Sequence, residues 1–409
     1  MRYIGIITLL VLCLTLLLLT GCMTNTVTPE IDNGNLEEPV TEEPVTEEPG
    51  TVYPQKWATG DGTAENPWAN NCIQTAYDNT PIGGTIFLRA GYYQMDSQLS
   101  ILKQINIIGE GMNKTIIVTG DNKSFLVNAD HVSIKSLTVD GDAMTDAVEI
   151  ALFTLIACDY VILENVEIKN GGYYGLNILE TSYSSFQNIH AHDNYRHGIH
   201  FGAPVEDSVE NCYNTYRDIY CWDNGVCGFD GSGQLNNDVL LPSYNIYDSI
   251  YAWDNGSHGI CLALETHVSL TNSRAWDNGS GGITFQIVNN STIDNCFTHS
   301  NDASGIYIMY SEGISLSNVI SKNNGAPGGH TFCGMFVQDS PSTKISNSQF
   351  YDDQIEMIQS YGLWLAGTTE YDIEITNCKL TPNLNGGICN SVGAVITITE
   401  TKLARFYQL

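Results

Sequence analysis

Titratable side chains gather in the middle of the chain at positions that could do acid–base chemistry. The pair of greatest interest is His200 with Asp230, because a histidine held by a carboxylate keeps one tautomer and can abstract a proton. Arg196 and His197 stand just before His200. We take these four residues as the candidate catalytic group.

An internal repeat predicts how these residues are brought together. Trp-Asp-Asn-Gly recurs at residues 222–225, 253–256 and 276–279, and short alternating stretches such as 268–273 precede such turns. A glycine that precedes an apolar residue recurs at 198, 228, 259, 282, 305, 334 and 362, in steps of 23 to 31 residues. Period-2 strands separated by Asn, Asp and Gly turns at this interval predict a β-solenoid, whose coils bury their apolar side chains against one another.

The residue two positions after each repeated glycine should face solvent, because alternate residues of a strand point to opposite faces. This expected outward column reads Asn177, His200, Asp230, Cys261, Thr284, Tyr307, Phe336 and Trp364. The expected substrate-binding residues are Tyr307, Phe336, Trp364, Tyr361, Gln286 and His258. Aromatic faces carry sugar rings, so a polar cluster beside an aromatic strip suits a polysaccharide groove. The alternative is that the rings stack only to stabilise the coils.

Metal binding is predicted less sharply. A column of His197, Cys227 and His258 offers ligands, but they would lie ~4.8 Å apart and no fourth ligand is evident, so metal ligands stay unassigned. The repeated Asp and Asn residues of the turns are interpreted as architecture. Stacked aspartates would repel one another unless water or calcium lies between them, so Ca²⁺ is the one cofactor expected. Calcium could also bridge the acidic protein to an anionic glycan.

Composition excludes some partners. The chain has 409 residues, with 46 Asp and Glu against 16 Lys and Arg, and a formal net charge of −30. Nucleic acid is excluded as a partner because binding phosphates needs clustered Lys and Arg. Hydrophobic residues make up 43% of the chain, which is enough for a core.

The first 21 residues have the charged start and apolar stretch of a secretory signal. Leu19-Thr20-Gly21-Cys22 resembles a lipobox, in which Cys22 is lipidated and becomes the mature N-terminus. Residues 22–55 form an acidic tether rich in Pro, Glu and Thr, and 56–409 the folded domain. We therefore expect export, with a lipid on Cys22 as the only membrane contact, at the cell membrane or outer membrane and exposed at the cell surface or in the periplasm.

Ten cysteines remain after Cys13 and Cys22. Most are expected to be small core residues, since there is no CxxC motif. Export permits disulfides, and Cys212, Cys221 and Cys227 are the ones most expected to bridge.

The N-terminal part of the domain resembles the capping helix and first coils of right-handed parallel β-helix proteins of the pectate-lyase-like superfamily. The residues that carry this resemblance are 60–68, 73–76, 83–88, 90–93 and 107–111. Ile73, Ala76 and Tyr77 make one apolar helix face that can close the end of the solenoid. The resemblance covers about residues 56–403 and implies an all-β fold, a right-handed parallel β-helix with an N-terminal capping helix.

Two further resemblances concern activity. Residues 195–200 resemble the Tyr-Gly-Ile/Phe-Asp-Pro-His segment of alginate epimerases built on this helix, although the Asp-Pro is missing, and this implies a catalytic His200. Calcium-dependent pectate lyases pair several groove carboxylates with a basic residue. That resemblance implies Arg196 or Arg217 as the base, yet the outward columns hold a single carboxylate, Asp230.

The prediction is a surface-anchored protein that acts on or binds a polysaccharide, as a lyase, a C5-epimerase or a glycoside hydrolase. On a uronate, His200 would abstract the proton next to the carboxylate, Asp230 would orient His200, and Arg196 would bind the carboxylate. The alternative is a non-catalytic glycan binder, adhesin or component of the cell envelope.

Overall fold

The computed structural model describes residues 51–52, 68–120, 123–143, 150–202, 211–233, 235–236, 239–326, 332–368, 371–402 and 406–408. The expected signal segment, Cys22 and nearly all of the expected tether lie outside these residues. Within the described residues, no helix has the length and apolar character needed to cross a membrane.

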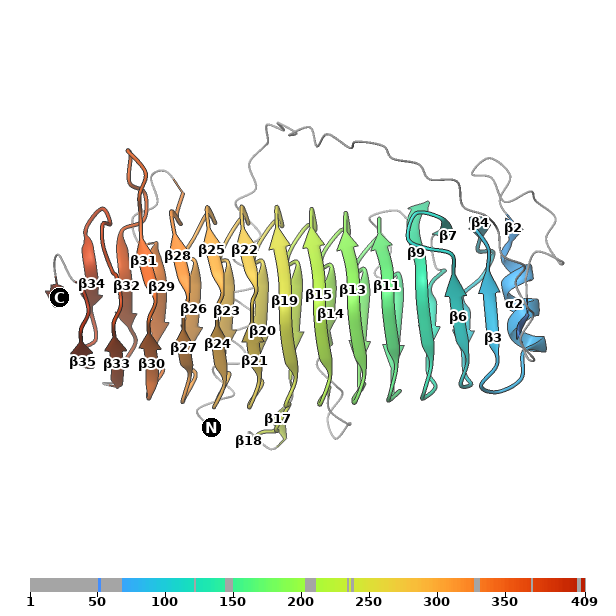
Figure 1. Cartoon of the computed structure of the whole chain (residues 1–409), viewed down its shortest axis with the longest axis horizontal. Coiled ribbons are helices and arrows are strands. Elements are labelled where there is room, and N and C mark those ends of the chain that lie inside the picture. The colour runs from blue at the N-terminus through green and yellow to red at the C-terminus, as the bar shows by residue number, and fades with distance from the viewer. Residues whose placement is uncertain are drawn as a thin grey trace, which may run out of the picture. The chain divides into compact units, whose positions relative to one another are not determined.

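The described residues form a parallel β-solenoid of about 11 turns, as Figure 1 shows. Strands of successive coils pair along its length to make a 21-stranded and a 13-stranded sheet. Every strand pairing in the described part of the chain is parallel, except that of the short strands β17 (Leu235–Asn236) and β18 (Val239–Leu240). The all-β solenoid prediction is confirmed.

The 13-stranded sheet forms one face of the solenoid, which we call the site face. Its strands are β5 (Leu99–Ile101), β8 (Phe125–Val127), β10 (Phe153–Ile156), β12 (Leu176–Leu179), β14 (Ile199–Phe201), β16 (Phe229–Ser232), β20 (Ile260–Ala263), β23 (Ile283–Gln286), β26 (Ile306–Met309), β29 (Cys333–Gln338), β32 (Tyr361–Ala366), β34 (Gly386–Asn390) and β36 (Phe406–Gln408).

The 21-stranded sheet folds around the remaining two faces. Its strands are β1 (Thr51–Val52), β2 (Trp68–Ala69), β3 (Thr85–Leu88), β4 (Gly91–Gln94), β6 (Asn106–Gly109), β7 (Thr115–Gly120), β9 (Ser133–Ala143), β11 (Ile162–Lys169), β13 (Ser185–His192), β15 (Thr215–Trp222), β19 (Ile246–Trp253), β21 (Ser269–Thr271), β22 (Arg274–Trp276), β24 (Thr292–Asp294), β25 (Phe297–His299), β27 (Ser315–Ser317), β28 (Ile320–Lys322), β30 (Thr343–Ser346), β31 (Gln349–Tyr351), β33 (Asp372–Thr376) and β35 (Val395–Thr399).

A bend divides this second sheet into two faces. The long strand β19 pairs with both β21 and β22, and it turns at Ser249, whose φ is 60°. In the next coil Asn272, with φ 53°, makes the same bend between β21 and β22. We call the face that carries β22 the tryptophan face.

Each coil sends apolar side chains inward from all three faces. In one coil these are Leu270, Ala275 and Ile283, all fully buried. At the N-terminal end, helix α2 (Asn70–Asn79) buries Ile73, Ala76 and Tyr77 against the first coils. The prediction of a capping helix with this apolar face is therefore confirmed. Pairing begins before the expected start of the domain near residue 56, because β1 pairs with β3.

Buried asparagines connect the coils at the turn between the tryptophan face and the site face. Each side-chain amide of Asn194, Asn224, Asn255, Asn278 and Asn301 donates to the side-chain oxygen of the asparagine one coil further on, over 2.9–3.0 Å. The first four of these asparagines are preceded by aspartates with φ of 50° to 54°, a left-handed conformation that aspartate tolerates. The asparagine ladder is architectural, as predicted.

None of the ten cysteines in the described part of the chain forms a disulfide. The prediction that Cys212, Cys221 and Cys227 bridge was wrong, because they occupy different points around the coil. Cys221 points into the core from β15, Cys227 lies before the strand of the site face, and Cys212 contacts Ser182.

One carboxyl group lies deep in the core. Glu265 is fully buried in the turn after β20, where its Oε1 accepts a hydrogen bond of 2.7 Å from the Tyr247 hydroxyl. Its Oε2 has no partner among the described residues. Burial raises the pKa of Glu265 to about 8 from its usual 4.5, although hydrogen bonds oppose the rise.

Glu265 should make the stability of the protein depend on pH. The folded protein keeps this proton up to about pH 8, whereas an unfolded chain releases it near 4.5, so its contribution falls as pH rises between those values. In Glu265→Gln, which cannot ionise, we expect a gain in unfolding free energy over wild type that grows from pH 5 to 9, to roughly 3–5 kcal/mol. Urea unfolding at several pH values measures this difference in unfolding free energy.

Glu164→Gln, at a partly exposed ion pair with Lys135, is the matched control. Its unfolding free energy should differ from that of wild type by nearly zero at every pH. A flat difference for Glu265→Gln would contradict the burial argument.

Candidate active site

Parallel pairing places His200 of β14 beside Asp230 of β16 on the outer side of the site face. His200 Nδ1 lies 2.8 Å from Asp230 Oδ2. About a fifth of each side chain is exposed, so the pair can meet a ligand. The structure therefore brings together the two residues that the column in the sequence predicted to be neighbours.

Asp230 is held in its ionised form. Burial raises the pKa of Asp230, but the hydrogen bonds from His200 and Cys261 and the neighbouring imidazoles outweigh it, and the pKa lies below its usual value. The Cys261 thiol, whose own pKa burial raises well above the usual value, also bonds to Asp230. An ionised carboxylate only accepts hydrogen bonds, so His200 carries its proton on Nδ1 and leaves Nε2 with a free lone pair.

His197 lies behind this pair. It is 3% exposed, and its Nδ1 sits 3.6 Å from Asp230 Oδ2 without a hydrogen-bond partner among the described residues. Its ring stacks on that of His200, with centroids 5.2 Å apart. Burial lowers the pKa of His197 to about 4, although the charge of Asp230 opposes this, so the imidazole is neutral at neutral pH.

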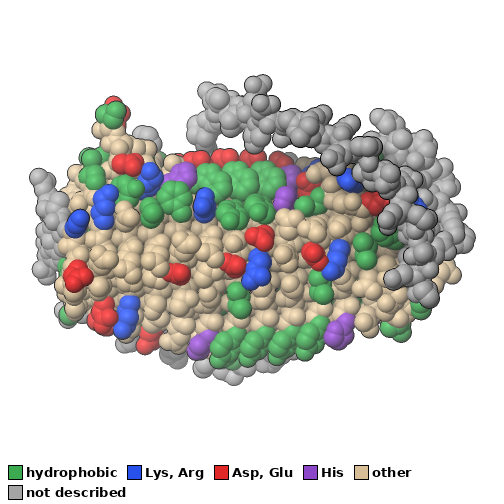
Figure 2. Space-filling model, in the orientation of Figure 1, with side chains coloured by type: hydrophobic (Ala, Val, Ile, Leu, Met, Phe, Trp, Pro, Cys, Tyr) green, Lys and Arg blue, Asp and Glu red, His purple; other side chains and the backbone are tan. Residues whose placement is uncertain are grey.

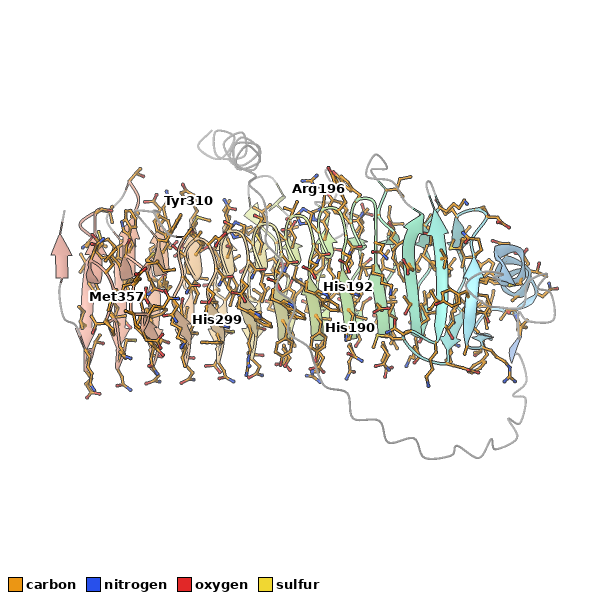
Figure 3. All side chains as sticks on the ribbon, turned by 90° about the horizontal axis from the view of Figure 1, so that it is seen from above. His190, His192, Arg196, His299, Tyr310 and Met357 are labelled. Carbon is orange, nitrogen blue, oxygen red and sulfur yellow. The ribbon has the colours of Figure 1, made fainter. Side chains whose placement is uncertain are left out.

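Arg196 brings a positive charge to the edge of the same cluster. It donates a hydrogen bond of 2.6 Å from Nη1 to the Tyr173 hydroxyl, and its guanidinium lies 5.0 Å from the Tyr173 ring centroid. Tyr174 completes the group, with its ring centroid 4.2 Å from that of His200. Figure 3 labels Arg196 on one side of the solenoid, away from His190 and His299.

The two tyrosines were not among the predicted site residues. Tyr174 precedes His197 by one coil, since the Gly175 amide bonds to the His197 carbonyl, so the column read from the sequence contained the signal. Tyr173 carried no such signal, because its position depends on the shape of the turn.

The remaining predicted residues continue along the site face. The His258 ring contacts Thr284 through Nδ1 at 3.0 Å and lies edge-on to Tyr307 at 6.0 Å. Burial lowers the pKa of His258 to about 4. Gln286 is partly exposed in the neighbouring column.

Four aromatic residues follow, and they are not stacked face to face. Tyr307 and Phe336 have centroids 5.6 Å apart at 58°, and Phe336 and Trp364 5.8 Å apart at 78°. Tyr361 lies edge-on to Trp364 at 6.1 Å. Tilted rings leave parts of their faces uncovered, so these side chains can contact a ligand. The column from His200 to Trp364 spans six coil steps, about 29 Å at ~4.8 Å per coil.

The donors of this cluster suit some metals better than others. His197, His200 and Asp230 form the one group of three in the described residues whose ligand atoms lie within 4.8 Å of one another. Two imidazoles and one carboxylate suit zinc and its neighbours. They do not fit Ca²⁺, which takes six or more oxygen ligands. The column of His197, Cys227 and His258 is not such a group.

Arg217 does not belong to this site. It lies in β15 of the 21-stranded sheet, where its Nε is 3.2 Å from Asp248 Oδ2. The expectation that Arg217 acts as the proton-abstracting base was wrong, because Arg217 lies on a different face of the solenoid from His200.

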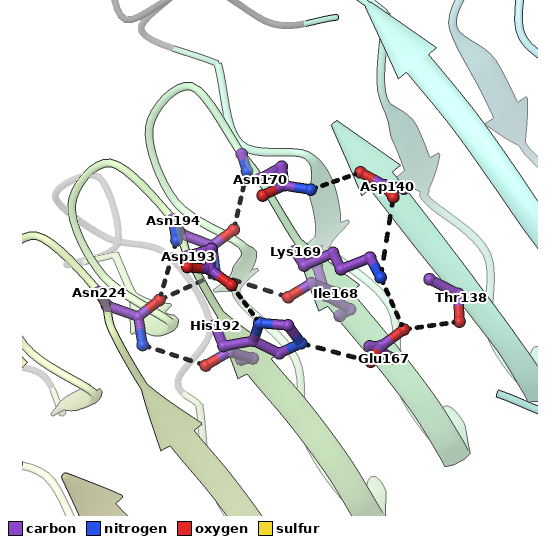
Figure 4. Close-up of polar contacts among 12 residues, drawn as sticks. Thr138, Asp140, Glu167, Ile168, Lys169, Asn170, His192, Asp193, Asn194 and Asn224 are labelled. Carbon is purple, nitrogen blue, oxygen red and sulfur yellow. Dashed lines mark hydrogen bonds and ion pairs between the residues drawn. The ribbon is translucent and has the colours of Figure 1, made fainter. Parts of the chain in front are cut away.

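A second polar cluster lies on the tryptophan face (Figure 4). His192 is 2.6 Å from Asp193 through Nδ1 and 3.3 Å from Glu167 through Nε2. Burial raises the pKa of Glu167, but hydrogen bonds from His192 and Thr138 and the charge of Lys169 outweigh this effect. The pKa of Glu167 is therefore lowered from its usual value to about 2. Glu167 and His192 are less than 10% exposed, so this closed network is structural.

Comparisons with known proteins agree with this architecture. The family model described as "Right handed beta helix region" matches residues 243–403. The pectate lyase PEL9 of Emericella nidulans is 24% identical over 180 residues, which are 43% of this chain and 42% of that enzyme. The chain thus matches less than half of that relative's length.

Two solved structures share the fold over most of this chain. The A-module of the mannuronan C-5 epimerase AlgE4 of Azotobacter vinelandii superimposes with a TM-score of 0.63 at 17% identity, covering 87% of this chain and 99% of that module. The catalytic unit of an α-1,3-glucanase of Streptomyces thermodiastaticus gives 0.50 at 13% identity, covering 87% and 69%. These likenesses show that the chain has the fold of a right-handed parallel β-helix.

The electrostatic description of His197 can be tested by NMR. In the presence of EDTA, the ring of His197 should titrate with a midpoint near 4. In Asp230→Asn the midpoint should fall further, because the charge of Asp230 raises the pKa of His197. A midpoint near 6.5 in either protein would show that His197 is not desolvated as described. His267, an exposed histidine on another face, is the internal reference.

Proposed function

We propose that this protein is a carbohydrate-active enzyme that abstracts the proton at C5 of a uronate residue within a polysaccharide. The observation that carries the proposal is the hydrogen bond between His200 Nδ1 and an ionised Asp230 on the outer side of the site face. The solved structures and the pectate lyase that resemble this chain bear names of polysaccharide-acting enzymes, which supports the substrate class.

The reaction begins at His200. Its Nε2 takes the proton from C5, and the C–H electron pair moves toward the substrate carboxylate to give an enediolate. Asp230 stabilises the imidazolium that forms, without itself taking the proton. Arg196, on the edge of the cluster, binds the carboxylate and stabilises its growing negative charge.

Two outcomes follow from the same intermediate. If the electron pair returns to form a C4–C5 double bond, the glycosidic oxygen leaves C4, takes up a proton, and the enzyme is a lyase. If C5 receives a proton on its opposite side, the enzyme is an epimerase. Hydrolysis is disfavoured, because it requires a pair of carboxyl groups, and among the described residues the outward columns of the site face offer one, Asp230.

The aspartates of this protein are placed so that an anionic substrate can reach the site face. The aspartates of the repeated turns, such as Asp223 and Asp254, follow the tryptophan face, whereas Arg196 is on the site side. A polyuronate can therefore approach the site face although the net charge of the chain is −30. The aromatic strip from Tyr307 to Trp364 would hold the sugar rings beyond the reacting residue.

Proton NMR of the full chain with polymannuronate, polyguluronate and polygalacturonate in D₂O tests this. Vinyl protons would identify a lyase, and deuterium at C5 an epimerase. His200→Ala should lower turnover at least about 100-fold, because it removes the base. Each substrate is run with Ca²⁺ and with EGTA, since calcium bridging of the glycan stays a prediction from the sequence.

The matched control is His267→Ala, which removes a histidine from another face and should leave turnover unchanged. Full turnover in His200→Ala would contradict the proposed base. No turnover of any substrate by the wild type, together with intact binding, would favour the non-catalytic glycan binder.

We also propose that a lipid on Cys22 holds the protein at the membrane, at the cell surface or in the periplasm. The support is the sequence around residues 19–22. Cys22→Ser should abolish incorporation of labelled palmitate and move the protein from the membrane fraction to the soluble fraction. Cys13→Ser, within the apolar stretch, is the control and should change neither. Labelled palmitate in Cys22→Ser would contradict the assignment.

A further inference from the structure

A continuous aromatic column occupies the tryptophan face. Trp222, Trp253 and Trp276 stack with centroids 5.0 Å apart and planes within 7° of parallel. His192 continues the column at one end, 4.0 Å from Trp222, and His299 at the other, 6.1 Å from Trp276. Parallel rings at this separation are offset, so each covers its neighbour only in part.

A second aromatic column runs beside the first. Tyr220 and Tyr251 stack at 5.1 Å, and the ring of His190 lies edge-on to Tyr220 at 4.8 Å. The three tryptophans, His299 and the side chains of the second column are partly exposed, whereas His192 is buried. Figure 2 shows the broad hydrophobic patch that results, with histidines at its ends and acidic side chains along its upper border.

That border is a row of exposed aspartates. Asp193, Asp223, Asp254 and Asp277 occupy the same position in successive coils, and Asp302 lies two residues further along the turn of the next coil. Partial burial, followed by the charge of neighbouring aspartates, raises the pKa of Asp223, Asp254 and Asp277. Asp193 has a partner, His192. No ion pair of the described residues involves the other four.

Most cations near the patch are already paired. Lys169 lies 3.4 Å from Glu167, and Lys322 lies 3.1 Å from Asp353. Arg274 stands in the second column, beyond Tyr251, on the side of the tryptophans away from the aspartates. The aspartate row therefore offers uncompensated negative charge directly beside the tryptophans.

We propose that the tryptophan face is a second, non-catalytic binding surface for a linear amino-sugar polysaccharide. The pyranose rings would lie along Trp222, Trp253 and Trp276, and the ammonium groups would bind the aspartate row. Aromatic rings bind the C–H faces of sugars, and carboxylates next to aromatic rings favour an ammonium group. A bound cation would also relieve the repulsion between the aspartates.

The spacing favours a glycan over a basic peptide. Both the rings and the aspartates repeat once per coil, and the ring centroids lie 5.0 Å apart. One pyranose residue advances an extended β-1,4-linked chain by about one coil, and successive residues are turned over, so every second ammonium group faces every second aspartate of the row. Side chains on one side of an extended peptide recur every ~6.8 Å, so a peptide would lose register with the coils.

The surface is separate from the proposed active site. His200 lies on the site face, whereas the tryptophan column lies on the 21-stranded sheet. The inference therefore does not rest on the proposed reaction, and a binding assay can fail or succeed without any turnover.

Isothermal titration calorimetry of the full chain with a β-1,4-linked glucosamine hexamer tests the proposal. We expect binding that weakens at high salt because it depends on charge. Trp253→Ala should weaken it about tenfold, through loss of an aromatic contact. The double substitution Asp223→Asn with Asp254→Asn should weaken it similarly, and asparagine keeps the left-handed turn.

Tyr213→Ala is the matched control. Tyr213 belongs to another stacked, exposed aromatic ladder, with Tyr183 at 5.1 Å and Tyr244 at 5.2 Å, but the residue that follows it is Asn214, where each tryptophan is followed by an aspartate. This variant should bind the hexamer as wild type does. Circular dichroism of each variant checks that the solenoid is intact.

Three results would overturn the proposal. One is no binding of the glucosamine hexamer by the wild type. Another is binding that survives both the Trp253 and the aspartate substitutions. The third is that hexalysine binds as tightly as the glucosamine hexamer and loses affinity to the same extent in the variants. That result would identify the surface as a site for basic peptides.

Discussion

The hydrogen bonds between buried asparagines fix the register on which both surfaces of this molecule depend. From Asn224 onward, each asparagine oxygen of this ladder accepts from a side-chain amide and a backbone amide of the preceding coil, as Asn255 does from Asn224. Removing these partners inside the protein would leave polar groups unsatisfied, at a cost of about 1–3 kcal/mol each. A coil shifted by one residue would lose these bonds and turn its inward side chains outward. The ladder thus selects one register against its neighbours.

The fixed register converts repeats in the sequence into columns in space. His200 and Asp230 are 30 residues apart in the chain, yet their side chains touch because equivalent positions of adjacent coils pair. The same rule places Trp222 on Trp253 on the tryptophan face. Function on this scaffold therefore depends on which residue type stands at a given outward position of each coil. The fold does not require a particular residue type at those positions.

The sequence was informative wherever a feature repeats. Glycine spacing and strand alternation were enough to predict the solenoid, the outward column through His200 and Trp364, and the apolar face of the capping helix. Features set by a single turn could not be read in this way. Tyr173 reaches Arg196 through the shape of one loop, and the Cys261 contact with Asp230 requires knowledge of side-chain direction. Arg217 was misassigned because the resemblance asked only for a basic residue and did not say which sheet carries it, and the expected cysteine bridges failed because the coil separates the three residues.

The direction of the bonds between coils has a mechanical consequence. Backbone bonds of the sheets and side-chain bonds of the asparagine ladder all join one coil to the next, and few contacts reach beyond the adjacent coil. A force that pulls the two ends of the solenoid apart would load the bonds of one coil at a time. The molecule would then lengthen by successive release of single coils at low force, and would resist most strongly when pushed from the side, where the loads are shared by all the coils at once.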